Sequence, residues 1–339
     1  MSDRDRDGAA AEAIAHPNIA LAKYWGKRSF GHNLPAVPSL SVTLEGMATR
    51  TRVVLDAAAT SDTFLLAGTV APDAAKVRVV GLLHRVRQRA GSSLFARVES
   101  ANDFPTSSGL ASSASAFAAL ATAATAVYGV DASDAERSSL ARKTSVSAAR
   151  SVLGGFVELR AGIEGDVELA AVQLAPPEAW EVAIVVAATT RAAKETASTE
   201  GMAHTVATSP YHAAWVDYAP RVFEQAKAAL AARDIEKMGD AVEASAFAMH
   251  ADAIAARPTV VYWNPGTMAA IAEVRALRKG GLGVWATMDA GPHVKVLTRA
   301  ADADRVRDAM RAVPGVVDAF IARPGAGSRI LSDAASSSR

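Results

Sequence analysis

A run of serine and glycine residues at positions 105–114 (PTSSGLASSA) has the composition of a loop that binds phosphate. Small side chains let backbone N–H groups approach an anion closely, and the hydroxyl groups add further donors. The N-terminus of a following helix would add partial positive charge. The run lacks the Gly-Lys-Ser/Thr ending of a Walker A loop. Taken alone, it is also compatible with a simple turn that caps a helix.

Residues 18–28 (NIALAKYWGKR) bring basic and aromatic side chains close together. Lys23, Lys27 and Arg28 supply positive charge that suits a phosphate group, and the Tyr24 hydroxyl is a hydrogen-bond donor. The alternative interpretation is the basic end of a strand with Trp25 in the interior.

Residues 143–155 (KTSVSAARSVLGG) combine two hydroxyl groups with a guanidinium group. Ser145 and Ser147 are two positions apart, and Arg150 follows three positions later. This set could surround a diphosphate or a carboxylate, because arginine offers a two-pronged fork to either group. The alternative is an ordinary capped helix with a surface arginine.

Asp289 stands at the end of a predicted strand, just before Gly291 and Pro292. An aspartate in this place either forms a turn or projects a carboxylate into a cleft as a general base. The seven histidines show no zinc-ligand spacing. We expect His250 and His293 to have structural or surface roles.

These side chains need helices and strands to position them, and the apolar periodicity of the chain predicts where those lie. The predicted strands cover residues 40–44, 52–56, 94–100, 157–160, 182–188, 284–288, 294–298 and 316–321. The predicted helices cover residues 111–127, 213–232, 267–279 and 302–312, with one more after the predicted N-cap Asp234. Helices beside an antiparallel sheet indicate an α+β sandwich.

Composition limits the class of protein. A chain of 339 residues predicts two domains. The 36 basic and 35 acidic side chains leave a net charge of +1, so no overall basic field argues for nucleic acid as a partner. The absence of cysteine excludes disulfides and thiol catalysis. The charged N-terminus and the Ser- and Thr-interrupted apolar run predict neither a signal peptide nor a membrane span, and hence a cytoplasmic location.

Together the motifs resemble the diphosphomevalonate decarboxylase family of the GHMP kinase superfamily. The matching segments, in the order and spacing of the family, are NIALAKYWGKR (18–28), PSLSVTL (38–44), NDFPTSSGLASSAS (102–115), SVSAARSVLGGFVE (145–158), STEGM (198–202), YWNP (262–265) and TMDAGP (287–292). The resemblance implies an α+β GHMP kinase fold. An N-terminal ribosomal-protein-S5-like α/β domain (13–189) would hold the nucleotide, and a C-terminal ferredoxin-like α/β sandwich domain (190–331) would close the cleft. Residues 1–12 and 332–339 are expected to be flexible tails.

The resemblance also implies an activity and its site. The activity is the ATP-dependent decarboxylation of (R)-5-diphosphomevalonate to isopentenyl diphosphate, with Mg²⁺ as cofactor and commonly a homodimer as the assembly. Asp289 matches the catalytic aspartate, Arg150 the arginine that faces the substrate carboxylate, and Lys23 a lysine near the reacting phosphoryl group. The implied substrate-binding residues are Tyr24, Trp25, Gly26, Lys27, Arg78, Ser145, Val146, Ser147 and Ser198. The implied nucleotide-binding residues are Asn102, Ser107, Ser108, Gly109, Ser112 and Ser113.

Three positions depart from the family pattern, and the second and third of them leave the choice between a diphosphate and a monophosphate substrate open. Val146 replaces a usual glycine, Thr199 stands where some bacterial relatives have an arginine, and Ser29 replaces a frequent aspartate. The alternatives are a phosphomevalonate decarboxylase that makes isopentenyl phosphate, a kinase that stops after phosphorylating the 3-hydroxyl, and a non-catalytic GHMP-fold binding protein. The last should have lost the basic cluster, the loop or the aspartate, and all three are present.

Overall fold

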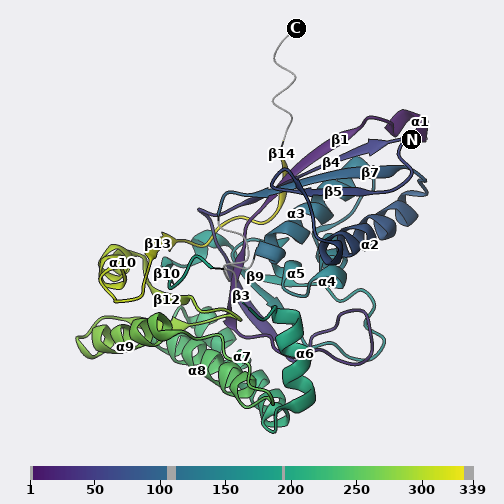
Figure 1. Ribbon diagram of the computed structural model, residues 1–339. Coiled ribbons are helices and arrows are strands. Elements are labelled where there is room, and N and C mark those ends of the chain that lie inside the picture. Colours follow the sequence, from purple (N-terminus) through teal and green to yellow (C-terminus); the bar gives the residue numbers. More distant parts are fainter. Residues whose placement is uncertain (1–2, 105–111, 193–194, 332–339) are drawn as a thin grey trace.

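The computed structural model describes residues 3–104, 112–192 and 195–331, and these residues form three β-sheets with helices packed against them (Figure 1). Within these ranges, no helix is both long enough and apolar enough to cross a membrane. The first sheet and its helices lie at one end of the molecule, and the third sheet with its helices lies at the other (Figure 1).

The first sheet has six strands in the order β14–β1–β4–β7–β5–β6. The strands are β1 (Ala10–Ala15), β4 (Thr49–Asp56), β5 (Thr63–Leu66), β6 (Thr69–Val70), β7 (Phe95–Asn102) and β14 (Arg329–Leu331). The associated helices are α1 (Asp3–Arg6), α2 (Asp73–Ala90), α3 (Ser112–Val127), α4 (Asp134–Thr144) and α5 (Ala148–Ser151). The alanine-rich helix α3 is almost wholly buried, because its small side chains allow close packing against the sheet.

Residues 3–12 are ordered, so the predicted N-terminal tail is wrong over this range. The Asp3 carboxylate accepts hydrogen bonds from the backbone N–H and the hydroxyl of Ser93. Residues 10–12 belong to strand β1, which pairs with β4 on one side and with β14 on the other. The charged sequence of residues 3–12 does not predict this regular structure, because the structure depends on pairing with strands that are distant in the chain. The predicted tail at 332–339 lies outside the described residues.

The second sheet is small and antiparallel, in the order β2–β3–β8–β9. Its strands are β2 (Asn18–Ala22), β3 (Ser39–Thr43), β8 (Phe156–Leu159) and β9 (Val172–Ala175). Every residue of β2 and β3 is buried. This sheet therefore forms the interior between the two ends of the molecule.

The third sheet has the order β11–β12–β10–β13, all antiparallel, which is the strand order of a ferredoxin-like sandwich. Its strands are β10 (Val182–Ala188), β11 (Val284–Thr287), β12 (Val294–Arg299) and β13 (Asp318–Ala322). The helices of this half are α6 (Ser198–Thr208), α7 (His212–Ala232), α8 (Ile235–Ile254), α9 (Pro265–Lys279) and α10 (Ala303–Arg311), with single 3-10 turns at Pro177–Ala179 and Ala300–Asp302.

The domain boundary predicted at residue 189 is wrong, because β10 is a central strand of the third sheet. The predicted end of the second domain at residue 331 needs correction too, since β14 returns to pair with β1 in the first sheet. A nearly continuous apolar strand can be buried in either domain, and its partners are not visible in its own sequence.

Strand β10 has one face toward each of two hydrophobic clusters. Val182, Ile184 and Val186 pack with α7, α8 and strands of the second sheet. The intervening residues Ala183 and Val185 pack with α9 and α10. The first cluster includes residues from both domains, so it fixes the position of the third sheet relative to β2 and β3.

Candidate active site

The carboxylate of Asp289 lies between two lysine ammonium groups that come from different domains. Asp289 follows β11, and its backbone oxygen accepts a hydrogen bond from Gly291 in the turn toward β12. Lys23 follows β2, and its Nζ lies 2.6 Å from Asp289 Oδ1. Lys295 on β12 places its Nζ 3.4 Å from Asp289 Oδ2. The aspartate thus forms a turn and also projects a charged group between the domains.

Lys23 is held firmly in the interior. Its Nζ also donates a hydrogen bond to the backbone oxygen of Ala20, at 2.9 Å. Its backbone N–H donates to the hydroxyl of Ser245 on α8, at 2.8 Å. Burial lowers the pKa of Lys23 to about 8, against the opposing effect of Asp289. The ammonium form is favoured at neutral pH, but little above it.

Arg150 is buried, which excludes the alternative of a surface arginine. Its guanidinium donates to the hydroxyl groups of Ser39 and Ser41, at 2.7 and 3.0 Å. It also donates to Asn18 Oδ1 at 3.3 Å, while the Asn18 amide donates to Ser147 O and to Ser151 Oγ. Burial lowers the pKa of Arg150 to about 10, so it is cationic at neutral pH. Two adjacent strands, β2 and β3, therefore fix the direction of this guanidinium.

The charged groups of the site have an excess of positive charge, which favours anionic ligands. Burial raises the pKa of Asp289, but Lys23 and Lys295 lower it more strongly, to about 2, so the carboxylate is ionised at neutral pH. Asp289, Lys23, Lys295 and Arg150 together carry three positive charges and one negative charge. The Asp289 side chain is 24% exposed, whereas those of Lys23 and Lys295 are almost completely buried. A negatively charged ligand at the open face of Asp289 would offset the excess charge.

A second group of candidate residues gathers around the loop between α4 and α5. The hydroxyl groups of Ser145 and Ser147 are 3.3 Å apart. Arg78 on α2 donates to the backbone oxygen of Thr144, at 3.1 Å. The pKa of Lys27 is lowered by burial and by the charge of Arg78, which places these two cations near each other. The arrangement is suited to a diphosphate or phosphate group, which would separate the repelling cations.

Val146 and Tyr24 support this loop from the apolar side. Val146 is buried among Leu34, Ala149 and Leu159, and Tyr24 packs against the same cluster. Burial raises the pKa of Tyr24, so its hydroxyl keeps its proton and is available as a donor. The side chain of Val146 therefore belongs to the core, and the two serines flank it.

Trp25 and Gly26 connect the basic segment to α6 and α7. The Trp25 ring packs in a cluster with Met202 and Trp215, and the Trp215 indole N–H donates to the Trp25 backbone oxygen at 2.8 Å. Gly26 has φ +99° and lies against His212, so any side chain there would be strained and crowded. Ser198 begins α6, four residues before Met202. The structure thus brings α6 toward the Lys23–Lys27 segment.

The predicted nucleotide loop is described only at its edges. Asn102 ends β7 and accepts a hydrogen bond from the Thr49 hydroxyl at 2.6 Å. Ser112 and Ser113 stand in the first turn of α3. Ser107, Ser108 and Gly109 lie outside the described residues. Thr49 also shares a hydrogen bond with Ser115 of α3, which connects the end of β7 to the start of this helix.

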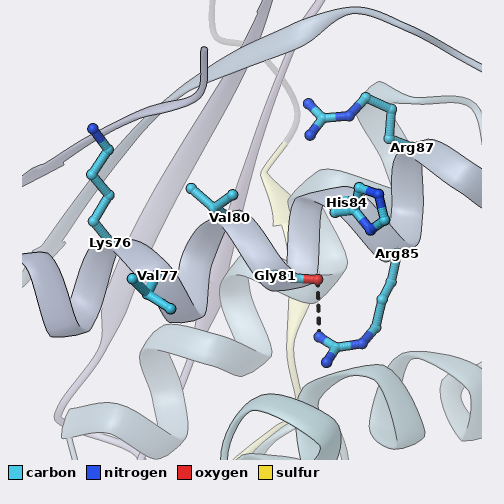
Figure 2. Close-up of a pocket in the computed structure, with 7 residues that line it drawn as sticks. All are labelled: Lys76, Val77, Val80, Gly81, His84, Arg85 and Arg87. Carbon is cyan, nitrogen blue, oxygen red and sulfur yellow. Dashed lines mark hydrogen bonds between the residues drawn. The ribbon is translucent and has the colours of Figure 1, made fainter.

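A hollow of about 460 Å³ lies on the outer face of α2 (Figure 2). It is lined by Lys76, Val77, Val80, Gly81, His84, Arg85 and Arg87. The Arg85 guanidinium donates to the backbone oxygen of Gly81, one turn earlier on the same helix, at 2.9 Å (Figure 2). None of the candidate site residues lines this hollow, so it is separate from the Asp289 site.

Lys295 was not predicted from the sequence. In the alternation of β12, Lys295 shares a face with Leu297 of the interdomain cluster, but the sequence alone does not show that this face is buried. His250 and His293 were predicted to be structural or on the surface, and both are fully buried. The ring of His293 accepts a hydrogen bond from the Thr189 backbone N–H at 3.2 Å, which is a structural role.

The described residues do not contain three or more His, Asp or Glu side chains gathered as a metal cage. In enzymes that act on nucleotides, Mg²⁺ is commonly held by substrate phosphates, water and few protein ligands. The hydroxyl groups of Ser112 and Ser113, at the start of α3, are oxygen donors of the kind that this ion accepts.

A ferredoxin-like domain facing a phosphate-suited loop across a buried cationic site defines a small-molecule enzyme of the GHMP kinase class. Residues 15–170 match the diphosphomevalonate decarboxylase-like N-terminal domain, and residues 183–322 match the mevalonate 5-diphosphate decarboxylase C-terminal domain. The chain belongs to the diphosphomevalonate decarboxylase family.

Relatives from distant organisms agree with this assignment. Diphosphomevalonate decarboxylase from Aspergillus fumigatus is 33% identical, over 92% of this chain and 82% of that protein. The human diphosphomevalonate decarboxylase is 35% identical, over 86% of this chain and 77% of that protein. The solved structure of mevalonate diphosphate decarboxylase from Staphylococcus aureus has a TM-score of 0.90 and 33% identity, covering 96% of this chain and 98% of that one. A structure of the Enterococcus faecalis enzyme has a TM-score of 0.86 and 35% identity, covering 95% and 99%.

Proposed function

We propose that the protein converts (R)-5-diphosphomevalonate to isopentenyl diphosphate, with ATP consumed and ADP, phosphate and CO₂ released. The family assignment supports this activity, as does a similar solved structure titled as MDDEF in complex with MVAPP, AMPPCP and magnesium, which has 36% identity and a TM-score of 0.88. The observation that carries the proposal is the Asp289 carboxylate between Lys23 and Lys295, with Arg150 close enough to interact electrostatically.

The first step is phosphoryl transfer to the tertiary hydroxyl group, because hydroxide itself is a poor leaving group. The hydroxyl oxygen forms a bond to the γ-phosphorus while the bond from that phosphorus to ADP breaks. Asp289 orients the hydroxyl and accepts its proton. Its pKa of about 2 makes it a weak base, which suits a loose transition state in which the proton leaves late. Lys23 stabilises the negative charge on the transferring group.

The second step is loss of phosphate and CO₂. The C3–O bond breaks and phosphate leaves with the electron pair. The bond between C2 and the carboxylate carbon then supplies the electrons of the new double bond. Arg150 orients the carboxylate, and the negative charge of Asp289 stabilises positive charge that grows on C3. The same carboxylate therefore serves both steps.

The remaining candidate residues hold the two phosphate-bearing ligands. Tyr24, Lys27, Arg78, Ser145, Ser147 and Ser198 bind the distal diphosphate, supported by Trp25, Gly26 and Val146. Asn102, Ser107, Ser108, Gly109, Ser112 and Ser113 bind the ATP phosphates. Magnesium, when bound with the nucleotide, offsets part of the phosphate charge, and Ser112 and Ser113 would be among its ligands. A homodimer and a cytoplasmic location stay predictions.

One assay tests the activity. Release of CO₂ and ADP is measured with mevalonate, 5-phosphomevalonate and 5-diphosphomevalonate in turn. We expect both products only with 5-diphosphomevalonate. Both products with 5-phosphomevalonate instead would identify a monophosphate decarboxylase. ADP without CO₂ would identify a kinase, and no product from any of the three would leave a binding protein.

A further inference from the structure

Lys295 is an unusual residue for its place in the fold. It is fully buried on β12, with Val186 of β10 and Thr287 of β11 opposite it in the neighbouring strands. Its side chain lies on the face of the sheet that packs toward the N-terminal domain, as Leu297 does. Burying an ammonium group among such neighbours costs free energy unless an anion compensates. The Asp289 carboxylate, 3.4 Å away, supplies this negative charge.

We propose that Lys295 is a positioning residue that holds Oδ2 of Asp289 while Lys23 holds Oδ1. With Lys23 alone, the carboxylate could rotate about its Cβ–Cγ bond and keep one ion pair in several orientations. A second cation on the other oxygen restricts this rotation. The two lysines, one from each domain, thereby leave the solvent-facing edge of the carboxylate in one orientation toward the substrate hydroxyl.

The charged groups around Lys23 make this role measurable. Lys23 faces Asp289, Lys295 and Arg150, and His250 faces it from α8. Burial and the positive charge of Lys23 lower the pKa of His250 to about 3, and burial and Lys295 lower that of His293 to about 3. Both histidines are therefore neutral above about pH 5. Lys295 lowers the pKa of Lys23, so removing its charge should raise that pKa.

This inference rests on the proposed function, and its test uses the complete chain. Wild type, Lys295→Met and Lys295→Arg are assayed for CO₂ release from 5-diphosphomevalonate between about pH 6 and about pH 9.5. For Lys295→Met we expect kcat to fall about 10- to 100-fold, with KM changed less than about 3-fold. We also expect the alkaline limb of kcat/KM to move to higher pH. Lys295→Arg, which keeps the charge, should recover part of kcat and keep the wild-type limb.

Lys227→Met is the matched control. Lys227 on α7 also forms an ion pair with a carboxylate of the other domain, Glu158 on β8, at 2.7 Å. Its removal should change neither kcat nor the pH profile. A folded Lys295→Met protein with wild-type kcat and an unmoved alkaline limb would overturn the proposal, whereas an inactive wild type would refute the proposed function instead.

If Lys295→Met does not fold, Lys295→Gln takes its place, because the amide N–H can still donate to Oδ2 without carrying a charge. A folded Lys295→Gln protein should show the same move of the alkaline limb, with a smaller fall in kcat. A wild-type limb together with a wild-type kcat in this variant would overturn the proposal.

Discussion

The Lys23 ammonium and the Asp289 carboxylate are separated by 266 positions in the chain and by 2.6 Å in the structure. One follows a strand of the N-terminal domain, and the other follows a strand of the ferredoxin-like domain. The hydrophobic cluster shared by β2, β3, β10 and α8 brings them together. The site therefore depends on the packing of the two domains. A substitution of Lys23 or Asp289 should lower kcat more than it raises KM.

Asp289→Asn should lower kcat by about 10²- to 10⁴-fold and leave the KM for 5-diphosphomevalonate within a small factor. The amide keeps the shape of the side chain but cannot accept the hydroxyl proton or stabilise positive charge at C3. Steady-state measurement of ADP and CO₂ release checks both steps. An Asn variant with near-normal turnover would exclude Asp289 from the chemistry. In a single turnover, equal delays in ADP and CO₂ formation would place the defect at phosphoryl transfer, whereas ADP formed well before CO₂ would place it at decarboxylation.

Activity should decline in mildly alkaline solution because Lys23 loses its proton. Burial lowers the pKa of Lys23 from 10.5 to about 8 in the free protein. Below that pH the ammonium is present, and above it kcat/KM should fall about tenfold per pH unit. Bound anionic ligands stabilise the ammonium form of Lys23. The alkaline decline of kcat should therefore occur at higher pH than the alkaline decline of kcat/KM. A pH profile of kcat/KM that is flat through about pH 9.5 would show that the Lys23 charge is not required.

Local sequence patterns predicted much of the fold. Asp234 caps α8 as expected, with its side chain accepting from the Lys237 N–H. Helix α2 was missed, because Pro72 precedes it and no side chain caps its start. The assignment of β10 to the wrong domain and the predicted N-terminal tail have a common cause. Both depend on which distant strands pair with the segment, and a segment's own residues do not encode that choice.

The active site, like the fold, could be predicted only in part from the sequence. The residue types at positions 23, 150 and 289 and the family resemblance located three charges that the structure brings together. Lys295 escaped because a single lysine in an apolar strand resembles an exposed residue, and only the burial of both faces of β12 reveals its partner. Arg150 donates hydrogen bonds to Ser39, Ser41 and Asn18. These three residues lie in the motifs that carry the family resemblance, but no role was predicted for them from the sequence.

Lys27→Ala and Ser198→Ala should each raise the KM for 5-diphosphomevalonate about 10-fold while kcat changes little. Both side chains are proposed to bind the distal diphosphate, far from the bonds that change, so their contribution is equal in the ground state and the transition state. Lys237→Ala, which removes a lysine that is 78% exposed on α8, is the control and should leave both parameters unchanged. A fall in kcat at constant KM for either test variant would contradict the diphosphate assignment.

Gly239→Ala should destabilise the protein even though alanine is the better helix former. An added Cβ at Gly239 on α8 would lie 1.9 Å from the ring of Trp285, which is buried on β11. The ring or the helix must move, and such overpacking lowers the free energy of unfolding by about 1–3 kcal/mol. The matched control is Gly81→Ala on α2, where the nearest atom is 3.7 Å away, so helix propensity should raise stability by about 0.5–1 kcal/mol. Thermal unfolding checks both signs. Because β11 leads directly to Asp289, Gly239→Ala should also lower kcat, and a variant with unchanged stability and kcat would show that the close approach of α8 to β11 does not position the carboxylate.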